Sequence, residues 1–146
     1  MPDLESVVDA MEVEMGELRD EYKQFRNLKI GKAYIFTDDF IIPQVKDFAV
    51  FICPETLSND RRMFLGNRAD EYYYIRVILL LKLERTKNQA YFVKALQLLE
   101  RYLLHNTLNN ELEVVGNNVS SELIDTGDSN TLGARIFYVG RKKVSI

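Results

Sequence analysis

Residues 70–85 read DEYYYIRVILLLKLER, and this stretch decides the fold. Every odd position from Tyr73 to Leu83 is apolar, whereas the even positions mix Tyr, Arg, Ile, Leu, Lys and Glu. An alternation of period two predicts a β-strand whose odd face is turned toward a core. Because this stretch is much longer than the usual strand of roughly five or six residues, we expect it at the centre of a sheet, paired on both sides.

Two segments, one before and one after this strand, carry apolar residues spaced by three or four. In the first segment they are Leu4, Val7, Val8, Met11, Met15, Leu18, Tyr22 and Phe25. In the second they are Phe92, Ala95, Leu96, Leu99 and Leu103, after a Thr86–Gln89 pattern that matches a capping box. A spacing near 3.6 residues predicts two amphipathic helices.

The ends of both helices are also expected from the sequence. Asp3 is the expected N-cap of the first helix, and Lys23, Arg26 and Lys29 collect at its far end. Positive charge at a C-terminus stabilises the helix dipole. His105-Asn106 marks the expected end of the second helix, since Asn tolerates a position after the last turn.

Several shorter stretches have the composition of strands. They are Lys32–Phe36, Phe40–Ile42, Val45–Cys53, Leu112–Val115, Val119–Ile124 and Leu132–Val139. Val45–Cys53 is apolar on both faces, so we expect both faces to be covered or to lie at an interface. Gly116-Asn117-Asn118 predicts a hairpin turn between two of the strands, and Asp125–Asn130 predicts a polar turn before the last.

Together these elements predict the α+β class and one domain over residues 1–146. We expect a mostly antiparallel β-sheet with two amphipathic helices packed on one face, and a long protruding loop or arm. The arm is Pro54–Ala69, which is longer than most connections. It contains an apolar group between polar residues, and with two tyrosines of the central strand it forms the predicted subunit or tail-tube interface. That interface comprises Arg61, Arg62, Met63, Phe64, Leu65, Tyr72 and Tyr74.

Composition limits the classes of function. The chain of 146 residues has 47% hydrophobic residues and a net charge of −3, which excludes a generally basic nucleic-acid coat. A single Cys and a single His exclude an internal disulfide and a zinc site of four Cys or His ligands within one chain. The acidic start is unlike a signal peptide, and no apolar run could span a membrane. We therefore expect a soluble protein made in a reducing cytoplasm.

Catalytic and metal-binding patterns are weak. Cys53 and His105 read as a buried thiol and a helix-end residue, and not as a nucleophile with its base. The aspartates at Asp38-Asp39 and at Asp125 and Asp128 read as turn residues, although a carboxylate metal site remains an alternative. Glu21-Tyr22-Lys23 has nuclease-like spacing but lies in the first helix. We expect no catalytic residue, no metal and no cofactor.

Two basic groups could contact nucleic acid. Arg61-Arg62 lies in the arm and Arg141-Lys142-Lys143 closes the chain, while Tyr72-Tyr73-Tyr74 could stack on bases. A face that tracks phosphates needs more charges than these. Tyrosines are equally typical of protein interfaces, which is the interpretation we prefer.

The order of the features resembles a known family. A leading helix precedes a strand that ends in Phe51-Ile52-Cys53-Pro54, and a polar arm leads to the long strand Tyr73–Leu83. A helix at Gln89–Leu104 follows at once, and short strands end in Ala134–Val139. This order resembles the tail-terminator, or tail-completion, proteins of long-tailed bacteriophages over nearly the whole chain.

The resemblance implies a structural virion protein and not an enzyme. It implies a homo-oligomeric ring, a hexamer, that caps the tail tube at its head-proximal end and forms the head–tail interface. The implied partners are other copies, the tail tube protein and head-completion or connector proteins. DNA passes through such a ring without sequence-specific binding. The implied location is the virion tail, with the host cytoplasm during assembly.

Two other classes of function stay open. One is a small adaptor or immunity-type module that binds another protein. The other is a metal-dependent enzyme using Asp38, Asp39 and Asp125.

Overall fold

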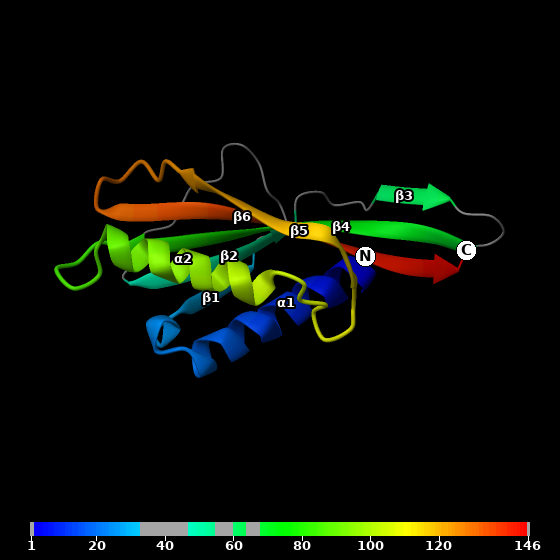
Figure 1. Cartoon of the computed structure of the whole chain (residues 1–146), viewed down its shortest axis with the longest axis horizontal. Coiled ribbons are helices and arrows are strands. Elements are labelled where there is room, and N and C mark those ends of the chain that lie inside the picture. Colours follow the sequence, from blue (N-terminus) through cyan, green and yellow to red (C-terminus); the bar gives the residue numbers. More distant parts are fainter. Residues whose placement is uncertain (1, 33–46, 55–59, 64–67, 146) are drawn as a thin grey trace.

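The central strand of the computed structural model is β4, as the alternation of residues 70–85 predicts. The structure describes residues 2–32, 47–54, 60–63 and 68–145. The helices and strands are α1 (Pro2–Glu21), the 3₁₀ helix η1 (Lys23–Phe25), β1 (Lys29–Lys32), β2 (Phe48–Pro54), β3 (Asp60–Met63), β4 (Arg68–Lys82), α2 (Gln89–Leu103), β5 (Glu113–Ile124) and β6 (Thr131–Ser145). Figure 1 shows them with the longest axis of the molecule horizontal.

The sheet contains six strands in the order β1-β2-β4-β6-β5, with β3 paired to β4 outside this path. Among the described strands, β1 and β2 pair in parallel and the other pairs are antiparallel. β6 occupies one edge of β4 along its whole length, so β2 and β3 follow one another along the opposite edge. The α+β class and the mostly antiparallel sheet are therefore confirmed.

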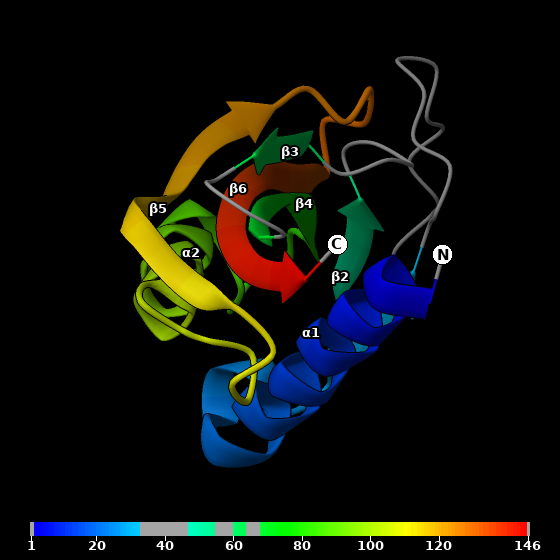
Figure 2. The same ribbon diagram turned by 90° about the vertical axis from the view of Figure 1, so that its right-hand side faces the viewer.

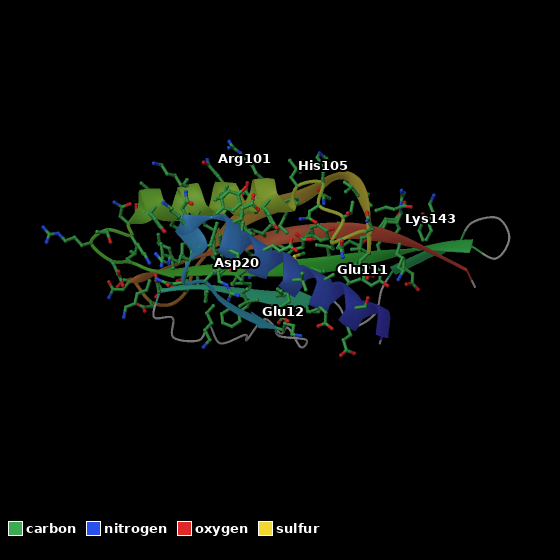
Figure 3. The ribbon with its side chains drawn as sticks, turned by 90° about the horizontal axis from the view of Figure 1, so that it is seen from below. Glu12, Asp20, Arg101, His105, Glu111 and Lys143 are labelled. Atoms are coloured by element: carbon green, nitrogen blue, oxygen red, sulfur yellow. The ribbon has the colours of Figure 1, made fainter. Side chains whose placement is uncertain are left out.

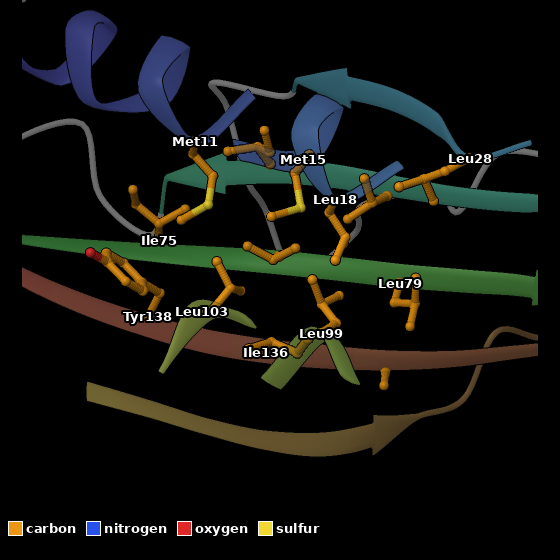
Figure 4. Packing of buried hydrophobic residues seen from close by; sticks show 14 of the residues in the cluster. Met11, Met15, Leu18, Leu28, Ile75, Leu79, Leu99, Leu103, Ile136 and Tyr138 are labelled. Carbon is orange, nitrogen blue, oxygen red and sulfur yellow. The ribbon is translucent and has the colours of Figure 1, made fainter. Parts of the chain in front are cut away.

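Both helices cover the same face of this sheet. One buried cluster joins the apolar stripes of α1 and α2 to Tyr73, Ile75, Val77, Leu79 and Leu81 of β4. Figure 4 shows Met11, Met15 and Leu18 of α1 and Leu99 and Leu103 of α2 converging on these strands. Figure 2 views the same layers along the sheet. Every residue of the α2 stripe is buried, which confirms the predicted helix face.

The ends of the helices differ from the expected ones. α1 begins at Pro2, which places Asp3 inside its first turn instead of at the N-cap. Proline suits a first helical position because its missing N–H would have no partner there. α1 ends at Glu21, so Arg19 is the only base in its last turn, and Lys23, Arg26 and Lys29 follow the helix.

The N-cap of α2 is Asn88 and not Thr86. The Asn88 side chain accepts a hydrogen bond from the backbone N–H of Tyr91 at 3.1 Å. At the C-terminal end of α2, His105 adopts the left-handed backbone conformation, with φ of 59°. From the sequence we expected Asn106 to occupy that capping position. The Asn106 side chain instead donates hydrogen bonds to Glu14 and to the carbonyl of Tyr102.

β2 is buried on both faces, as its sequence predicts. Phe48, Val50 and Ile52 belong to the cluster beneath the helices. Ala49 and Cys53 form a second cluster with Ile78 and Leu80 of β4. This cluster lies on the opposite face of the sheet from the two helices. Lys29–Lys32 forms β1 where Lys32–Phe36 was expected; the rest of that stretch and Phe40–Ile42 lie outside the described residues.

The hairpin predicted at Gly116-Asn117-Asn118 is wrong. The two predicted strands, Leu112–Val115 and Val119–Ile124, are parts of one strand, β5, which begins at Glu113. The glycine and asparagines make an irregularity between Val114 and Val119. Both halves pair with β6, so the chain never reverses there. Asn118 is buried and accepts a hydrogen bond from the backbone N–H of His105 at 3.1 Å, which ties β5 to the end of α2.

Candidate interaction surface

β4 and β6 continue as a pair beyond the point where the pairing of β5 with β6 stops. β4 and β6 pair from Arg68–Ser145 to Lys82–Thr131, but β5 reaches only Arg141 of β6. On the other edge β3 pairs with residues 69–72 of β4. We call β3, residues 68–74 of β4 and residues 139–145 of β6 the sheet extension; it projects past α2 and β5 in Figure 1.

The register of the extension places acids between bases. Arg61 of β3 and Lys142 of β6 lie opposite Glu71 of β4, on its two sides. Arg62 and Lys143 lie in the same way on the two sides of Asp70. Opposite charges at directly paired positions stabilise a sheet by roughly 0.2–1 kcal/mol each. The two basic groups therefore occupy register positions beside the acids of the central strand.

This arrangement corrects two sequence-based expectations. The basic residues 141–143 are not a tail that closes the chain, because they belong to β6 and pair with Asp70, Glu71 and Tyr72. The arm is not a loop throughout, because Asp60–Met63 is β3 and β4 already begins at Arg68. Both segments are polar or charged in sequence and lack the apolar alternation that predicts a strand. Their pairing with β4 is therefore visible only in the structure.

The two acids of the extension are almost completely buried. Asp70 is 3% exposed and Glu71 is 2% exposed. Glu71 accepts a hydrogen bond from the Tyr73 hydroxyl at 2.9 Å. The Oδ1 atom of Asp70 has no hydrogen-bond partner within the described part of the chain. A buried carboxylate is costly unless charge or hydrogen bonds offset its desolvation. The bases stand at the register positions directly paired with these two acids.

Arg141 links the extension to β5. Its Nη2 atom donates to Oε2 of Glu113 at 3.0 Å, which forms a half-exposed ion pair. The hydrogen bond to Glu113 raises the pKa of Arg141 above its usual value, and Tyr72 adds to the effect while burial partly opposes it. Arg141 remains charged at any pH at which the protein folds.

The structure brings together most of the predicted interface residues. Arg61, Arg62 and Met63 form β3, next to the β4 residues that precede Tyr74, and Asp60 pairs with Tyr72. Tyr72 and Tyr74 are half-buried, on the sheet face opposite Tyr73 and the helices. Phe64 and Leu65 lie outside the described residues. Sequence reasoning missed Asp70 and Glu71, although two acids at the start of an apolar strand were a visible signal.

The thiol and the imidazole have structural environments. Cys53 is buried in the second cluster, and this burial raises the pKa of its thiol to about 11, while Arg76 and Arg135 lower it to a smaller extent. A thiol with so high a pKa is protonated at neutral pH and is a poor nucleophile. His105 lies at the end of α2, where its backbone N–H is held by Asn118.

The aspartates near residue 125 hold their own turn. Asp125 accepts a hydrogen bond from the backbone N–H of Gly127 at 2.8 Å. Asp128 accepts from the backbone N–H of Asn130 at 2.9 Å and from the Thr131 hydroxyl at 3.1 Å. Both carboxylates are thus used as turn residues usually are.

Other metal and nuclease candidates give no cluster in the described ranges. Asp38 and Asp39 lie outside the described residues. Within residues 2–32, 47–54, 60–63 and 68–145 no group of three or more His, Cys, Asp or Glu side chains is arranged to hold a metal ion. Glu21-Tyr22-Lys23 spans the end of α1 and the start of η1.

None of the helices described here is long and apolar enough to cross a membrane. No protein-family model matches the chain. No curated protein matches it either. One solved structure, whose name gives no function, is similar at 12% sequence identity and a TM-score of 0.54. The alignment covers 97% of this chain and 96% of that one, and at this identity it supports the fold alone.

Proposed function

We propose that the chain is a structural protein of a long-tailed bacteriophage that forms a homo-oligomeric ring at the head-proximal end of the tail tube. The resemblance described from the sequence suggests this class, and the sheet extension is the observation that carries the proposal. A ring of six copies is the expected assembly. The tail tube protein and head-completion or connector proteins are its expected partners, and DNA passes through without sequence-specific binding.

The sheet extension suits assembly for two reasons. It is held within the subunit by strand pairing on both sides of β4, so it projects as a defined body beyond the helices. It also presents Tyr72 and Tyr74, half-buried, on the face away from the helices. Tyrosine is enriched at protein interfaces because it offers a large contact area at little entropic cost.

A ring needs contacts between two different patches of neighbouring subunits, because only a head-to-tail contact closes by rotation. The extension and the helix layer lie at different places on the molecule (Figure 1). We therefore expect the tyrosine face of one extension to pack against another surface of the next copy.

The test is the mass of the purified protein at rising concentration, with negative-stain images of the largest species. The proposal predicts closed rings with the mass of six copies of the 17.0 kDa chain. Tyr74→Ala should abolish the rings. The matched control, Tyr91→Ala, removes a tyrosine of similar exposure from α2 and should leave them intact.

Melting curves of both variants show whether loss of assembly reflects unfolding. A chain that stays monomeric or dimeric at every concentration would contradict the ring and favour the adaptor or immunity-type alternative. If Tyr74→Ala still forms rings, the contact between subunits does not depend on the tyrosine face.

A further inference from the structure

The edge of β6 that faces β5 is open over its last residues. The pairing of β5 with β6 begins at Glu113–Arg141, and no described strand lies beside Lys142–Ser145 on that side. The opposite edge of the same residues pairs with β4. Backbone N–H and C=O groups of an open edge are a ready template for another strand.

An open groove with a volume of about 530 Å³ lies at this edge. One wall is formed by Arg141, Lys142 and Lys143 of β6, and the other by the start of β5 and the loop before it. The groove thus lies between the open end of β6 and the start of β5. Its β6 wall includes Lys142 and Lys143, which pair with no described strand on the side of β5.

The loop that forms the second wall is held in a fixed shape. Leu108, Asn109 and Asn110 have successive positive φ angles of 51°, 57° and 65°. The Asn106 side chain accepts from the backbone N–H of Leu108 at 2.8 Å, and the Thr107 hydroxyl accepts from that of Asn110 at 3.2 Å. Strained backbone of this kind persists only where its surroundings hold it.

Leu108 and Leu112 anchor the loop because both side chains are buried. Leu112 lies over Gly140 of β6 so closely that a Cβ atom on the glycine would collide with it. The loop is therefore packed against β6 just before Glu113. The groove is a preformed feature of the fold, as ligand grooves usually are.

The charge of the groove selects the occupant. Three bases and two carboxylates line it, which leaves a formal charge of about +1. Glu113 pairs with Arg141 at 3.0 Å, and Glu111 accepts a hydrogen bond from the Ser6 hydroxyl at 3.2 Å. Lys143 is exposed and forms no ion pair with a described residue; Figure 3 shows it on the extension, beyond the helices. A strand with acidic side chains would meet positive charge along this wall.

The other exposed edges of this chain are poor partners for the groove. β3 carries Arg61 and Arg62, and β1 carries Lys29 and Lys32. Pairing either strand with Lys142–Ser145 of a second copy would place bases opposite bases, which destabilises a sheet. The acids of β5, Glu113 and Glu122, already form ion pairs with Arg141 and Arg135.

We propose that the groove binds an extended, acidic segment of a different protein, which adds as a strand to the Lys142–Ser145 edge of β6. Main-chain hydrogen bonds to the edge supply affinity, and the exposed Lys143 supplies the preference for acidic side chains. This proposal is independent of the ring, because the tyrosine face and the groove edge are different surfaces.

The probe is a fluorescent peptide of seven alternating Glu and Val residues with blocked ends, and binding to the whole chain is followed by anisotropy. We expect saturable binding that weakens with added salt. A Lys-Val peptide of the same length should not bind. The same Glu-Val peptide with every backbone N–H methylated should also fail, because it keeps its charge but cannot pair as a strand.

Lys143→Glu should weaken binding of the acidic peptide by about fivefold or more, the scale of replacing an opposite-charge pair by a like-charge pair. Lys94→Glu is the matched control, since Lys94 is an exposed lysine on α2, and it should bind as the unmodified chain does. Melting curves of both variants confirm that they fold.

Three results would overturn the proposal. Equal binding of the methylated peptide would mean that attraction is only electrostatic. Failure of the acidic peptide to bind would show that the groove does not accept an acidic strand. Loss of self-association in Lys143→Glu, measured by sedimentation, would assign the groove to a second copy of this chain.

Discussion

At the scale of single residues, Glu14 organises the contact between α1, α2 and β6. Its carboxylate is nearly buried and accepts hydrogen bonds from the Tyr102 hydroxyl at 3.1 Å and the Asn106 amide at 3.2 Å. The Asn106 carbonyl in turn accepts from the Tyr138 hydroxyl at 2.6 Å. Burial and, secondarily, Glu14 raise the pKa of both tyrosines, so they remain hydrogen-bond donors at neutral and moderately alkaline pH.

Removing Glu14 should cost stability. We expect Glu14→Ala to lower the free energy of unfolding by about 1 kcal/mol, because two half-buried donors, Tyr102 and Asn106, lose an acceptor. Glu17→Ala, an exposed change on the same helix, should alter it by no more than about 0.5 kcal/mol. Urea unfolding monitored by circular dichroism measures both. Equal midpoints for the two variants would show that the Glu14 network contributes nothing.

Cys53 gives a prediction about alkaline pH. Its thiol pKa is raised from 9.0 to about 11 in the folded chain, so the folded state disfavours the thiolate relative to the unfolded state. The stability that this provides is fully present below about pH 9 and is lost as the pH rises toward 11. The melting temperature should therefore fall more steeply over this interval in the natural chain than in Cys53→Ala. Parallel curves for the two proteins would contradict the thiol assignment.

At the scale of elements, α2 shows why helix boundaries are harder to predict than helix faces. Its buried stripe of Phe92, Ala95, Leu96, Leu99 and Leu103 agrees with the apolar spacing residue for residue. The N-cap is Asn88 and not the expected Thr86. The backbone N–H of Glu84 donates to the carbonyl of Lys87, so residues 84–87 form a turn before the helix begins. A capping pattern identifies a helix start to within a few residues.

Asn88→Ala tests this boundary. We expect it to destabilise the chain by about 1 kcal/mol, the usual effect of removing an N-cap side chain. Thr86→Ala should change the free energy of unfolding by no more than about 0.5 kcal/mol, because Thr86 is exposed and precedes the cap. Guanidinium unfolding of both variants decides the matter. A larger loss of stability in Thr86→Ala than in Asn88→Ala would show that Thr86 is the N-cap.

At the scale of the whole molecule, the sheet extension unites segments that lie far apart in the chain. β3, the start of β4 and the end of β6 meet there, and Asp70 and Glu71 are buried between basic positions of the outer strands. The extension therefore depends on the last residues of the chain, which a sequence reading takes for a solvated basic tail.

Deleting residues 141–146 should destabilise the whole chain and not merely shorten it. We expect a loss of about 3 kcal/mol or more, because the backbone groups of residues 68–72 in β4 lose the strand that pairs with them. The control replaces Arg141, Lys142 and Lys143 together by Gln, which keeps the strand and removes only charge, so it should cost less than the deletion. Urea unfolding compares the three proteins. A deletion without effect on the midpoint would restore the tail interpretation.

The sequence by itself determined the features that depend on local periodicity. These are the buried stripes of α1 and α2, the central place and inward face of β4, the two apolar faces of β2 and the α+β class that they imply. Such patterns can be read directly because a 3.6 or 2.0 residue period turns side chains of one kind to one side, whatever they later contact. The candidate tyrosines were found in the same way.

Only the tertiary structure decided which strands lie beside one another and in which register. It joined the two halves of β5 across Gly116-Asn117-Asn118, paired Asp60–Met63 with β4, and placed the basic residues of β6 opposite Asp70 and Glu71. It also left the Lys142–Ser145 edge open at the groove. The physical reason is that strand pairing joins residues far apart in the chain. Its register is set by burial and charge across the whole sheet, and these forces leave no periodic trace in polar segments.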